Sequence, residues 1–497
     1  MPAEGADARE ADEVDPKETH RGDPTARRPR VLIPLTILFA VRYVVRTGLL
    51  DRLREHADPV LALSWDDPAL MAELESLGVE AVRLPDPRVD ATVAKELERL
   101  TVHFRRRLRS PSTAIDRARA RRNWDRSTWL KRTARQLPLK ARTWLPGDER
   151  RAERALHAAL AANTNRGENE AFLEDLRIDA VVSITPFVSQ EQVLLWAAEH
   201  LEIPRITSVL SFDNITTRPP LTVAFERYLV WNRFNRAEIL RSYPGVSADQ
   251  IEIVGPAQFD FYAQDRYVIP EAEWRANLGL AAGAPTVLFG AGAVHIAPHE
   301  VQHVDQIVAA VRDGRLPADL RIVLRRHPLD KSGRWDRFAD EPVVALDDPG
   351  AIGTADFRPG HVNLGEDQVV ALCSSLAHSD VHVSVSSTMT LDGAFFGRPQ
   401  IGPAFDASPG APLDVHARGL YEREHFLPIV ASGGMALVHD PEDMVREIAA
   451  YLDDPKRHAA ERAEMLETMA TYTDGRATER IADAIAAFLE RLPERAR

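Results

Sequence analysis

The sequence is almost without cysteine, since Cys373 is the only one among 497 residues. A single thiol can neither close a disulfide within the chain nor supply a zinc site built from several cysteines. The sequence therefore excludes a disulfide-stapled extracellular domain and predicts a reducing compartment, the cytoplasm.

A long hydrophobic run is also missing. The most apolar stretch, residues 31–40, holds about ten residues, whereas a membrane-spanning helix needs about 20. Because Arg42 and Arg46 follow it, we predict a buried strand over Arg30–Ala40. About thirty largely polar residues precede the stretch, and this arrangement argues against a secretory signal.

The composition fits neither a disordered chain nor a fibrous repeat, because 44% of the residues are hydrophobic and 28% are charged. Domains usually hold about 100 to 200 residues, so this length predicts two large domains. Residues 1–28 are an exception. They contain almost no large apolar side chain, and we predict a disordered tail there.

Negative charge outnumbers positive charge overall, but positive charge is concentrated in one segment. The net charge is −13, yet residues 105–142 hold 14 Lys or Arg against Asp116 and Asp125, with Trp124 and Trp129 among them. This mixture suits an anionic membrane surface or a phosphate-bearing acceptor. A solvated helical face is the alternative. We expect no nucleic acid partner, because the rest of the chain is acidic and carries no recognisable binding module.

Aliphatic strand-like runs alternate with helical stretches along both halves of the chain, as in parallel sheets. The alternation pauses at Gly255–Tyr262 and restarts at Thr286. We therefore predict an α/β fold of two Rossmann-like domains whose parallel sheets face an interdomain cleft. The predicted divisions are a tail (1–28), a first domain (29–265) with a basic helical insertion (104–155), a second domain (266–475) and a helix (476–497) that crosses back to the first domain.

The most informative segment is a β-branched strand that runs through a Ser-Ser-Thr turn into a helix, over residues 379–399. Backbone N–H groups at the helix start, with the hydroxyls of Ser386, Ser387 and Thr388, predict a seat for a diphosphate. Asp392, one turn later, is a candidate ligand for a ribose or sugar hydroxyl. An ordinary helix cap, with Asp392 on a solvated face, explains the same residues equally well.

Two further segments follow predicted strands of the second domain. Arg326 and His327 lie in an Arg-Arg-His-Pro sequence, at the strand edge where parallel sheets bind ligands. Gly290 and Gly292 form a glycine-rich turn that allows close approach to the backbone. This turn lacks the full dinucleotide fingerprint, so we predict no NAD site.

In the first domain, Asp213 lies in the loop Ser211–Arg218. Its carboxylate is a candidate base for an acceptor hydroxyl if the loop faces the second domain. Stabilising the turn as an Asx residue is the competing role.

These segments resemble GT-B glycosyltransferases, nearest to bacterial surface-carbohydrate transferases and CDP-glycerol glycerophosphotransferases, and UDP-N-acetylglucosamine 2-epimerases more distantly. The likeness lies in the strand, Ser/Thr turn, acidic helix and Gly-x-Pro of residues 379–399, and in the Arg/Lys-x-His-Pro segment. The segments Ser211–Arg218 and Gly255–Asp260 are similar to two loops of these transferases, with Phe212 in place of Trp. By this resemblance Arg326 neutralises the departing diphosphate, and His327 contacts phosphate or orders its loop.

The resemblance implies a metal-independent transferase that needs no cofactor beyond its substrate. It would move a glycosyl or polyol-phosphate group from a nucleotide-activated donor to a cell-surface glycan or lipid-linked precursor. Such an enzyme would work in the cytoplasm or on the inner face of the membrane. A nucleotide-sugar 2-epimerase and a non-catalytic glycan-assembly protein are alternatives.

A zinc peptidase is a further alternative, because His299, Glu300 and His303 form a formal HExxH motif. Pro298 disturbs the helix start, and no glutamate lies between Glu300 and Glu341 to act as a third ligand. We therefore interpret the motif as a chance match and predict no metal site.

Overall fold

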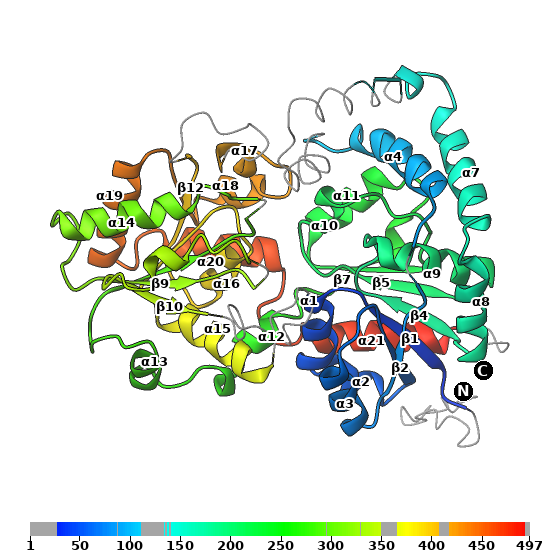
Figure 1. Ribbon diagram of the computed structural model, residues 1–497, viewed down its shortest axis with the longest axis horizontal. Coiled ribbons are helices and arrows are strands. Elements are labelled where there is room, and N and C mark those ends of the chain that lie inside the picture. Colours follow the sequence, from blue (N-terminus) through cyan, green and yellow to red (C-terminus); the bar gives the residue numbers. More distant parts are fainter. Residues whose placement is uncertain are drawn as a thin grey trace, which may run out of the picture.

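Short aliphatic runs of the sequence form two separate parallel sheets. A computed structural model describes residues 27–86, 88–110, 134, 137–138, 141–294, 296–328, 330–348, 365–406 and 417–492. Within these residues the chain folds into two α/β domains that lie side by side (Figure 1). Strands buried on both faces need continuous apolar sequence, as in Val31–Leu35, and such strands are typical of parallel sheets.

The first sheet has seven strands in the order β3-β2-β1-β4-β5-β6-β7. They are β1 (Arg30–Leu35), β2 (Asp58–Leu63), β3 (Glu80–Arg83), β4 (Ala180–Ser183), β5 (Arg205–Ser208), β6 (Arg227–Val230) and β7 (Ile251–Ile253). The second sheet has six strands in the order β10-β9-β8-β11-β12-β13. They are β8 (Thr286–Gly290), β9 (Arg321–Arg325), β10 (Val344–Asp347), β11 (Val381–Ser384), β12 (Gln400–Pro403) and β13 (Ala436–Val438).

Both sheets therefore follow the doubly wound Rossmann order, in which the chain starts in the middle and reverses its direction of growth once. The reversal lies between β1 and β4 in the first sheet and between β8 and β11 in the second. The prediction of an α/β chain with two parallel-sheet domains is confirmed.

Helices connect the strands. Those between the strands of the first sheet, and directly after it, are α1 (Leu38–Val41), η1 (Arg42–Arg46), α2 (Leu49–Leu53), α3 (Pro68–Ser76), α4 (Ala91–Arg105), α7 (Asp148–Ala161), α8 (Arg166–Asp175), α9 (Ser189–His200), α10 (Asn214–Thr217), α11 (Arg233–Ser242), η2 (Ala248–Gln250) and α12 (Phe259–Tyr262). Those that follow are η3 (Asp265–Tyr267), α13 (Glu271–Asn277), α14 (Val301–Arg312), η4 (Asp336–Phe338), α15 (Glu366–His378), α16 (Met389–Phe395), α17 (Ala417–Tyr421), α18 (Leu427–Ser432), α19 (Pro441–Asp453), α20 (Ala459–Ala470) and α21 (Ala477–Glu490).

The last helix, α21, lies against the first domain although it follows the second in sequence (Figure 1). Ile481, Ile485 and Leu489 are buried in the same apolar cluster as strands β1 and β2. The Asp260 carboxylate accepts the N–H groups of Ala477 (3.0 Å) and Thr478 (2.7 Å) and so caps the helix start.

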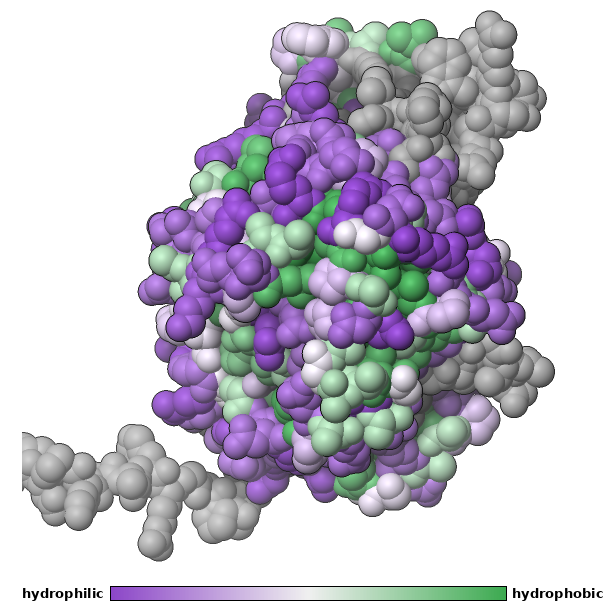
Figure 2. Space-filling view, turned by 90° about the vertical axis from the view of Figure 1, so that its left-hand side faces the viewer, coloured by the Kyte–Doolittle hydropathy of each residue, from purple (hydrophilic) through white to green (hydrophobic). Residues whose placement is uncertain are grey.

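An apolar cluster continues from one domain into the other. It joins Phe212, Trp231 and Phe259 to residues of the second domain such as Leu288 and Leu391. This shared core fixes how the two sheets lie relative to each other. The outer face of the second domain is mainly hydrophilic, with hydrophobic residues gathered in a band across its middle (Figure 2).

The structure corrects one expected strand. The strand predicted over Arg30–Ala40 ends at Leu35, and residues 38–41 are helical. A short apolar run is compatible with a buried strand or a buried helix, so periodicity cannot separate them. Thr36 marks the change, where its hydroxyl donates to the buried Glu191 carboxylate at 2.9 Å.

At the amino end, Arg27 and Arg28, which we placed in the tail, contact the first domain. Arg27 pairs with Asp179 at 2.8 Å, and Arg28 donates to the carbonyl of Arg54 at 2.7 Å. Residues 1–26 and most of 111–140, with Trp124 and Trp129, lie outside the described residues. In the part that is described, no helix is both long and apolar enough to cross a bilayer.

Candidate functional site

The carboxyl edges of the two sheets meet at the domain boundary. Thr216, which follows β5, hydrogen-bonds through Oγ1 to Nδ1 of His425 in the second domain at 3.1 Å. Gln258, which follows β7, donates to Asp392 after β11 at 2.9 Å. Parallel sheets bind ligands at this edge, at the point where the strand order reverses. The loops after β8 and β11 are therefore the candidate ligand site of the second domain.

The turn after β8 holds Gly290 and Gly292. The N–H of Gly292 donates to both carboxylate oxygens of Glu300, at 2.8 and 3.1 Å. A Cβ at Gly290 would lie 2.5 Å from the sulfur of Met389, which begins α16. Gly290 therefore lets the β11 loop approach β8, and the Gly292 amide is already used within the protein.

We expect Gly290→Ala to destabilise the fold by about 1 kcal/mol, because the added methyl group overlaps the sulfur end of the flexible Met389 side chain, which has to move. Met389→Ala in the same chain should recover most of this loss. Chemical denaturation of the two single variants and the double variant checks the prediction. A double variant no more stable than Gly290→Ala would show that the overlap is elsewhere.

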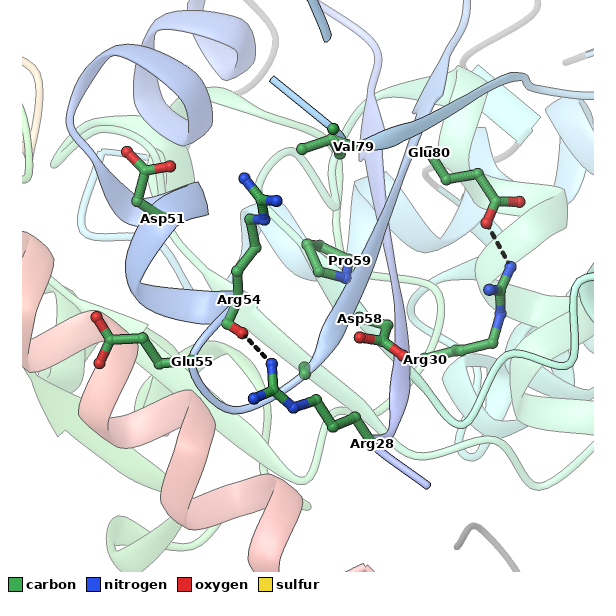
Figure 3. Close-up of a pocket in the computed structure, with 11 residues that line it drawn as sticks. Arg28, Arg30, Asp51, Arg54, Glu55, Asp58, Pro59, Val79 and Glu80 are labelled. Atoms are coloured by element: carbon green, nitrogen blue, oxygen red, sulfur yellow. Dashed lines mark hydrogen bonds and ion pairs between the residues drawn. The ribbon is translucent and has the colours of Figure 1, made fainter. Parts of the chain in front are cut away.

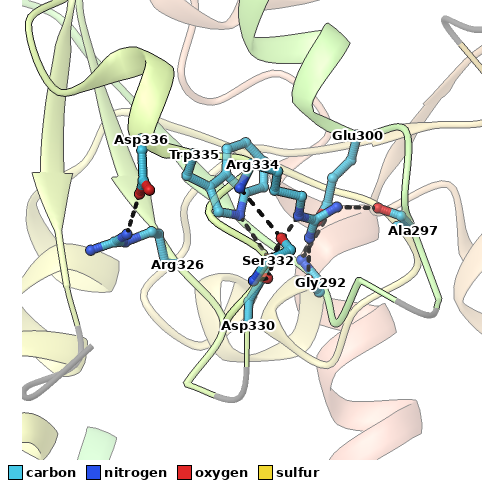
Figure 4. Close-up of polar contacts among 9 residues, drawn as sticks. All are labelled: Gly292, Ala297, Glu300, Arg326, Asp330, Ser332, Arg334, Trp335 and Asp336. Atoms are coloured by element: carbon cyan, nitrogen blue, oxygen red, sulfur yellow. Dashed lines mark hydrogen bonds and ion pairs between the residues drawn. The ribbon is translucent and has the colours of Figure 1, made fainter. Parts of the chain in front are cut away.

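Arg334 connects the loops after β8 and β9 (Figure 4). Its guanidinium donates to the carboxylates of Glu300 (2.6 Å) and Asp330 (2.7 Å), and to the carbonyls of Gly292 (2.8 Å) and Ala297 (2.6 Å). Both carboxylate side chains are completely buried. We call Arg334, Glu300 and Asp330 the Arg334 brace. It ties together the two loops that we predicted to bind the donor.

Burial and close contacts shift the pKa values of the two carboxyl groups of the brace in opposite directions. Burial raises the pKa of Glu300 to about 8, while Arg334 and the Gly292 amide favour its charged form. The pKa of Asp330 is lowered: burial alone would raise it, but hydrogen bonds from Ser332 and the charge of Arg334 outweigh this effect.

These contacts remove the basis for the zinc-peptidase alternative. Helix α14 begins at Val301, so His299 and Glu300 precede it and do not share the helical face that the motif requires. His303 is buried with its ring edge-on to Phe405, and burial lowers its pKa to about 4. Among the described residues, no group of three or more His, Cys, Asp or Glu side chains is arranged to hold a metal ion.

Arg326 directly follows β9. Its guanidinium is already paired with carboxylates of the protein, so a ligand would have to compete with them. The guanidinium hydrogen-bonds to both carboxylate oxygens of Asp348, which follows β10. It also lies 3.3 Å from the Asp336 carboxylate (Figure 4). His327 is half-buried, and its carbonyl accepts the N–H of Asp330 at 2.9 Å. The structure thus places both residues on the predicted edge, with Arg326 already ion-paired.

The loop after β11 contains a residue with an unfavourable backbone conformation, and hydrogen bonds with a buried tyrosine hold the loop in place. Ser386 has a φ of +45°, which is uncommon for a residue with a side chain. The buried Tyr421 hydroxyl accepts the Ser386 N–H at 3.0 Å and donates to the Ser384 carbonyl at 3.1 Å. Strain that the surrounding structure maintains is typical of functional sites.

The rest of this loop offers backbone N–H groups that could donate hydrogen bonds to a ligand. The Ser387 hydroxyl accepts the Met389 N–H at 3.2 Å. The N–H groups of Ser387 and Thr388 make no hydrogen bond to another described residue. Because α16 has only seven residues, any anion affinity here depends on these two amides more than on a helix dipole.

Asp392 does not lie on a solvated face, as the helix-cap interpretation assumed. It is 5% exposed, and Gln258 and Tyr262 hydrogen-bond to its carboxylate. Burial raises its pKa to about 6, and the nearby charge of Arg42 partly opposes the rise. Asp392 thus belongs to the contact between the domains.

Asp213 lies at the N-cap position of α10, but its carboxylate makes no capping hydrogen bond to the backbone. The carboxylate instead accepts two side-chain donors, Asn214 Nδ2 and Thr217 Oγ1, each at 3.1 Å. Its loop lies at the domain boundary, since Thr216 contacts His425. The structure therefore groups Gly290, Gly292, Arg326, His327, Ser386, Ser387, Thr388 and Asp392 along the second sheet, and it places Asp213 across the boundary in the first domain.

Sequence reasoning missed several residues of this region. Arg334, Asp330 and Tyr421 gave no signal, and Glu300 was considered only within the HExxH motif. Behind the Asp213 loop, Asn235 donates to the Phe212 carbonyl at 2.7 Å and to Glu238 at 3.0 Å. Burial raises the pKa of Glu238 to about 7. The signal in the sequence that could have revealed this pair is Asn-Arg-Ala-Glu, which places the polar Asn235 in the first turn of α11.

Two cavities lie away from these loops. One of about 570 Å³ is at the amino ends of β1, β2 and β3, where Arg28 donates to the Arg54 carbonyl and Arg30 pairs with Glu80 (Figure 3). The other, of about 300 Å³, lies between α4, α7 and the chain before β6. None of the predicted site residues lines either cavity.

Comparison with known proteins supports the fold. No protein-family model matches the sequence, and a search of curated proteins found no match. The UDP-GlcNAc 2-epimerase of Neisseria meningitidis bound to UDP-GlcNAc superposes with a TM-score of 0.51 at 12% identity, covering 92% of this chain and 100% of its own. The S. aureus MnaA-UDP structure gives 0.52 at 12% identity, covering 93% and 97%. At these identities the likeness concerns architecture alone. The chain therefore has the GT-B fold, two Rossmann-like domains on parallel sheets.

Proposed function

We propose that this protein transfers a glycosyl or polyol-phosphate group from a nucleotide-activated donor to a hydroxyl of a cell-surface glycan or lipid-linked precursor. The observation that carries the proposal is the meeting of two ligand-binding sheet edges. Loops after β5 and β7 contact elements after β11 and β12. A donor bound at the reversal between β8 and β11 would then face the first domain.

The diphosphate would bind at the β11 loop, where the amides of Ser387 and Thr388 are unused by the described protein and Ser386 is strained. The Arg334 brace would hold the turn after β8 in the position that diphosphate binding requires. Arg326 would supply positive charge to the leaving diphosphate by exchanging part of its pairing with Asp348. We propose that no metal or cofactor beyond the substrate is needed.

The acceptor would enter from the first domain. Asp213 remains our candidate base, and it would have to exchange its hydrogen bonds with Asn214 and Thr217 for the acceptor hydroxyl. The enzyme would work in the cytoplasm, on the inner face of the membrane where such acceptors are assembled.

A nucleotide-sugar 2-epimerase is the second candidate, because the structural likeness to epimerases covers 92% of this chain. An epimerase changes its nucleotide sugar without an acceptor. Incubating the protein with UDP-GlcNAc alone, followed by analysis of the sugar, separates the two. An epimerised product would favour the epimerase, whereas turnover that requires an acceptor would favour the transferase.

A thermal-shift panel of UDP, GDP, CDP and their sugar or polyol conjugates tests donor binding. A ligand at 100 times its Kd stabilises the folded state by about 2.7 kcal/mol, so one nucleotide series should raise Tm by several degrees. We expect Arg326→Ala to weaken that series by roughly tenfold or more, as the loss of a charge-assisted hydrogen bond predicts. Ser387→Ala removes only the hydroxyl and keeps the backbone amide, so it should weaken the series by a smaller factor.

Ser76→Ala and Arg312→Ala are the matched controls, because these residues are exposed and make their contacts on the outside of the domains. The controls should respond to the nucleotide as the unmodified protein does. Equal stabilisation of all four variants would place the donor elsewhere, and no response to any nucleotide would contradict the proposal.

A further inference from the structure

The turn before α7 exposes large hydrophobic side chains. Trp144 is 79% exposed and Leu145 is 54% exposed. Among the described residues, three of the eight exposed large hydrophobic side chains fall between 137 and 145. A single exposed apolar residue is ordinary, but such a concentration indicates a contact surface. We call residues 141–147 the Trp144 tip.

The base of the Trp144 tip is firmly anchored. Asp148 is buried and accepts hydrogen bonds from Arg99 Nε (3.1 Å) and His103 Nε2 (3.0 Å). Chiefly through Arg99, these contacts lower the pKa of Asp148 to about 2. The Arg106 guanidinium lies 4.5 Å from the Trp144 ring centre and donates to the Thr143 carbonyl at 2.5 Å. The tip is thus presented in a fixed conformation with its apolar side chains outward.

Exposed arginines lie in and directly after the Trp144 tip, at Arg142, Arg150 and Arg151, while Glu149 pairs with Arg107. In the sequence, the segment 105–142 carries 14 Lys or Arg against two Asp. Tryptophan with arginine at a protein surface is the composition of side chains that enter the boundary between lipid headgroups and acyl chains. An apolar groove of about 300 Å³ opens beside α4 and α7, and its other wall comes from the chain before β6 and after α11.

We propose that the Trp144 tip inserts into a bilayer that bears anionic headgroups, with Trp144 and Leu145 entering the interface and the arginines pairing with phosphate. The alternative occupant is a partner protein. Charge favours the bilayer, because exposed arginines beside two apolar side chains match a continuous anionic surface. Insertion does not depend on donor turnover, so it can be tested separately from the proposed function.

Sedimentation of the full-length protein with vesicles tests the proposal. We expect binding to phosphatidylcholine vesicles that contain phosphatidylglycerol, much weaker binding to phosphatidylcholine alone, and a decline with added salt. The double variant W144S/L145S should lose at least about tenfold in partitioning, because it removes the two side chains that are buried on insertion. Arg142→Glu with Arg150→Glu should abolish the preference for the anionic vesicles.

The matched control is L77S/L427S, which removes two exposed leucines elsewhere on the protein. It should bind vesicles as the unmodified protein does. Equal binding by W144S/L145S, absence of a preference for phosphatidylglycerol, or no binding of the unmodified protein to either vesicle overturns the proposal, the last in favour of a protein partner. Nucleotide thermal shifts of each variant should stay unchanged, and this readout separates failure of insertion from failure of the proposed function.

Discussion

Arg334→Met should lower the free energy of unfolding by about 3–5 kcal/mol, the range expected when a buried ion pair loses one partner. The substitution leaves the ionised Asp330 fully buried without its counter-charge. It also removes the guanidinium donor of Glu300, whose pKa of about 8 keeps this carboxyl mainly protonated at pH 7. For a domain of this size each kcal/mol shifts Tm by roughly 2–4 °C, so a fall of about 10 °C is expected. Urea denaturation and calorimetry check both values.

Neutralising the two carboxylates provides the control. Glu300→Gln with Asp330→Asn in the Arg334→Met background should recover a large part of the loss, because no unpaired charge then remains buried. An effect below about 1 kcal/mol for Arg334→Met would show that water reaches the brace. A loss that the two amides leave unchanged would show that packing, and not charge, is responsible.

Asp392→Asn should make the protein more stable at pH 7, by about 3 kcal/mol. Burial raises the pKa of Asp392 from its usual 3.8 to about 6, and each pKa unit corresponds to about 1.4 kcal/mol. The folded state therefore binds more protons than the unfolded state between these pH values. Stability from this group is fully present below pH 3.8 and is lost as the pH rises through about 6.

Denaturation curves of both proteins from pH 4 to pH 7.5 measure this difference. The gap between Asp392→Asn and the unmodified protein should be small at pH 4 and grow with pH. An Asp392→Asn protein that is less stable at pH 7 would show that Arg42 and Gln258 stabilise the carboxylate by more than its burial costs. A carboxylate that lowers stability at neutral pH, at a contact between domains, is a feature of functional sites.

The fold was accessible from the sequence because its signal is local. Strands such as Arg321–Arg325 contain an uninterrupted aliphatic run, here residues 322–324, and the helices between the strands keep a helical period. Strand order is not local, but the rules for parallel sheets leave few arrangements. The end of β1 was missed because residues 31–40 are apolar except for Thr36, and the contact of Thr36 with Glu191, which marks where the strand stops, is visible only in the structure.

The site was accessible only in part. The loops after β8, β9 and β11 were found because ligands bind at the ends of parallel strands. The contacts that these loops make could not be predicted, because they join residues that are distant in sequence. Asp348 pairs with Arg326 from the end of the neighbouring strand, 22 positions later, and no local pattern announces it. Likewise Asp392 resembles a surface residue in sequence and becomes buried only when Gln258 and Tyr262 of the domain connection cover it.

Donor binding at the β11 loop is the claim on which the transferase proposal depends. A crystal structure with the nucleoside diphosphate that gives the largest thermal shift tests it most directly. We predict phosphate oxygens within hydrogen-bond distance of the Ser387 and Thr388 amides, close to the turn at Gly290. A nucleotide bound at the arginine-lined cavity beside β2, or in the groove between α4 and α7, would contradict the account.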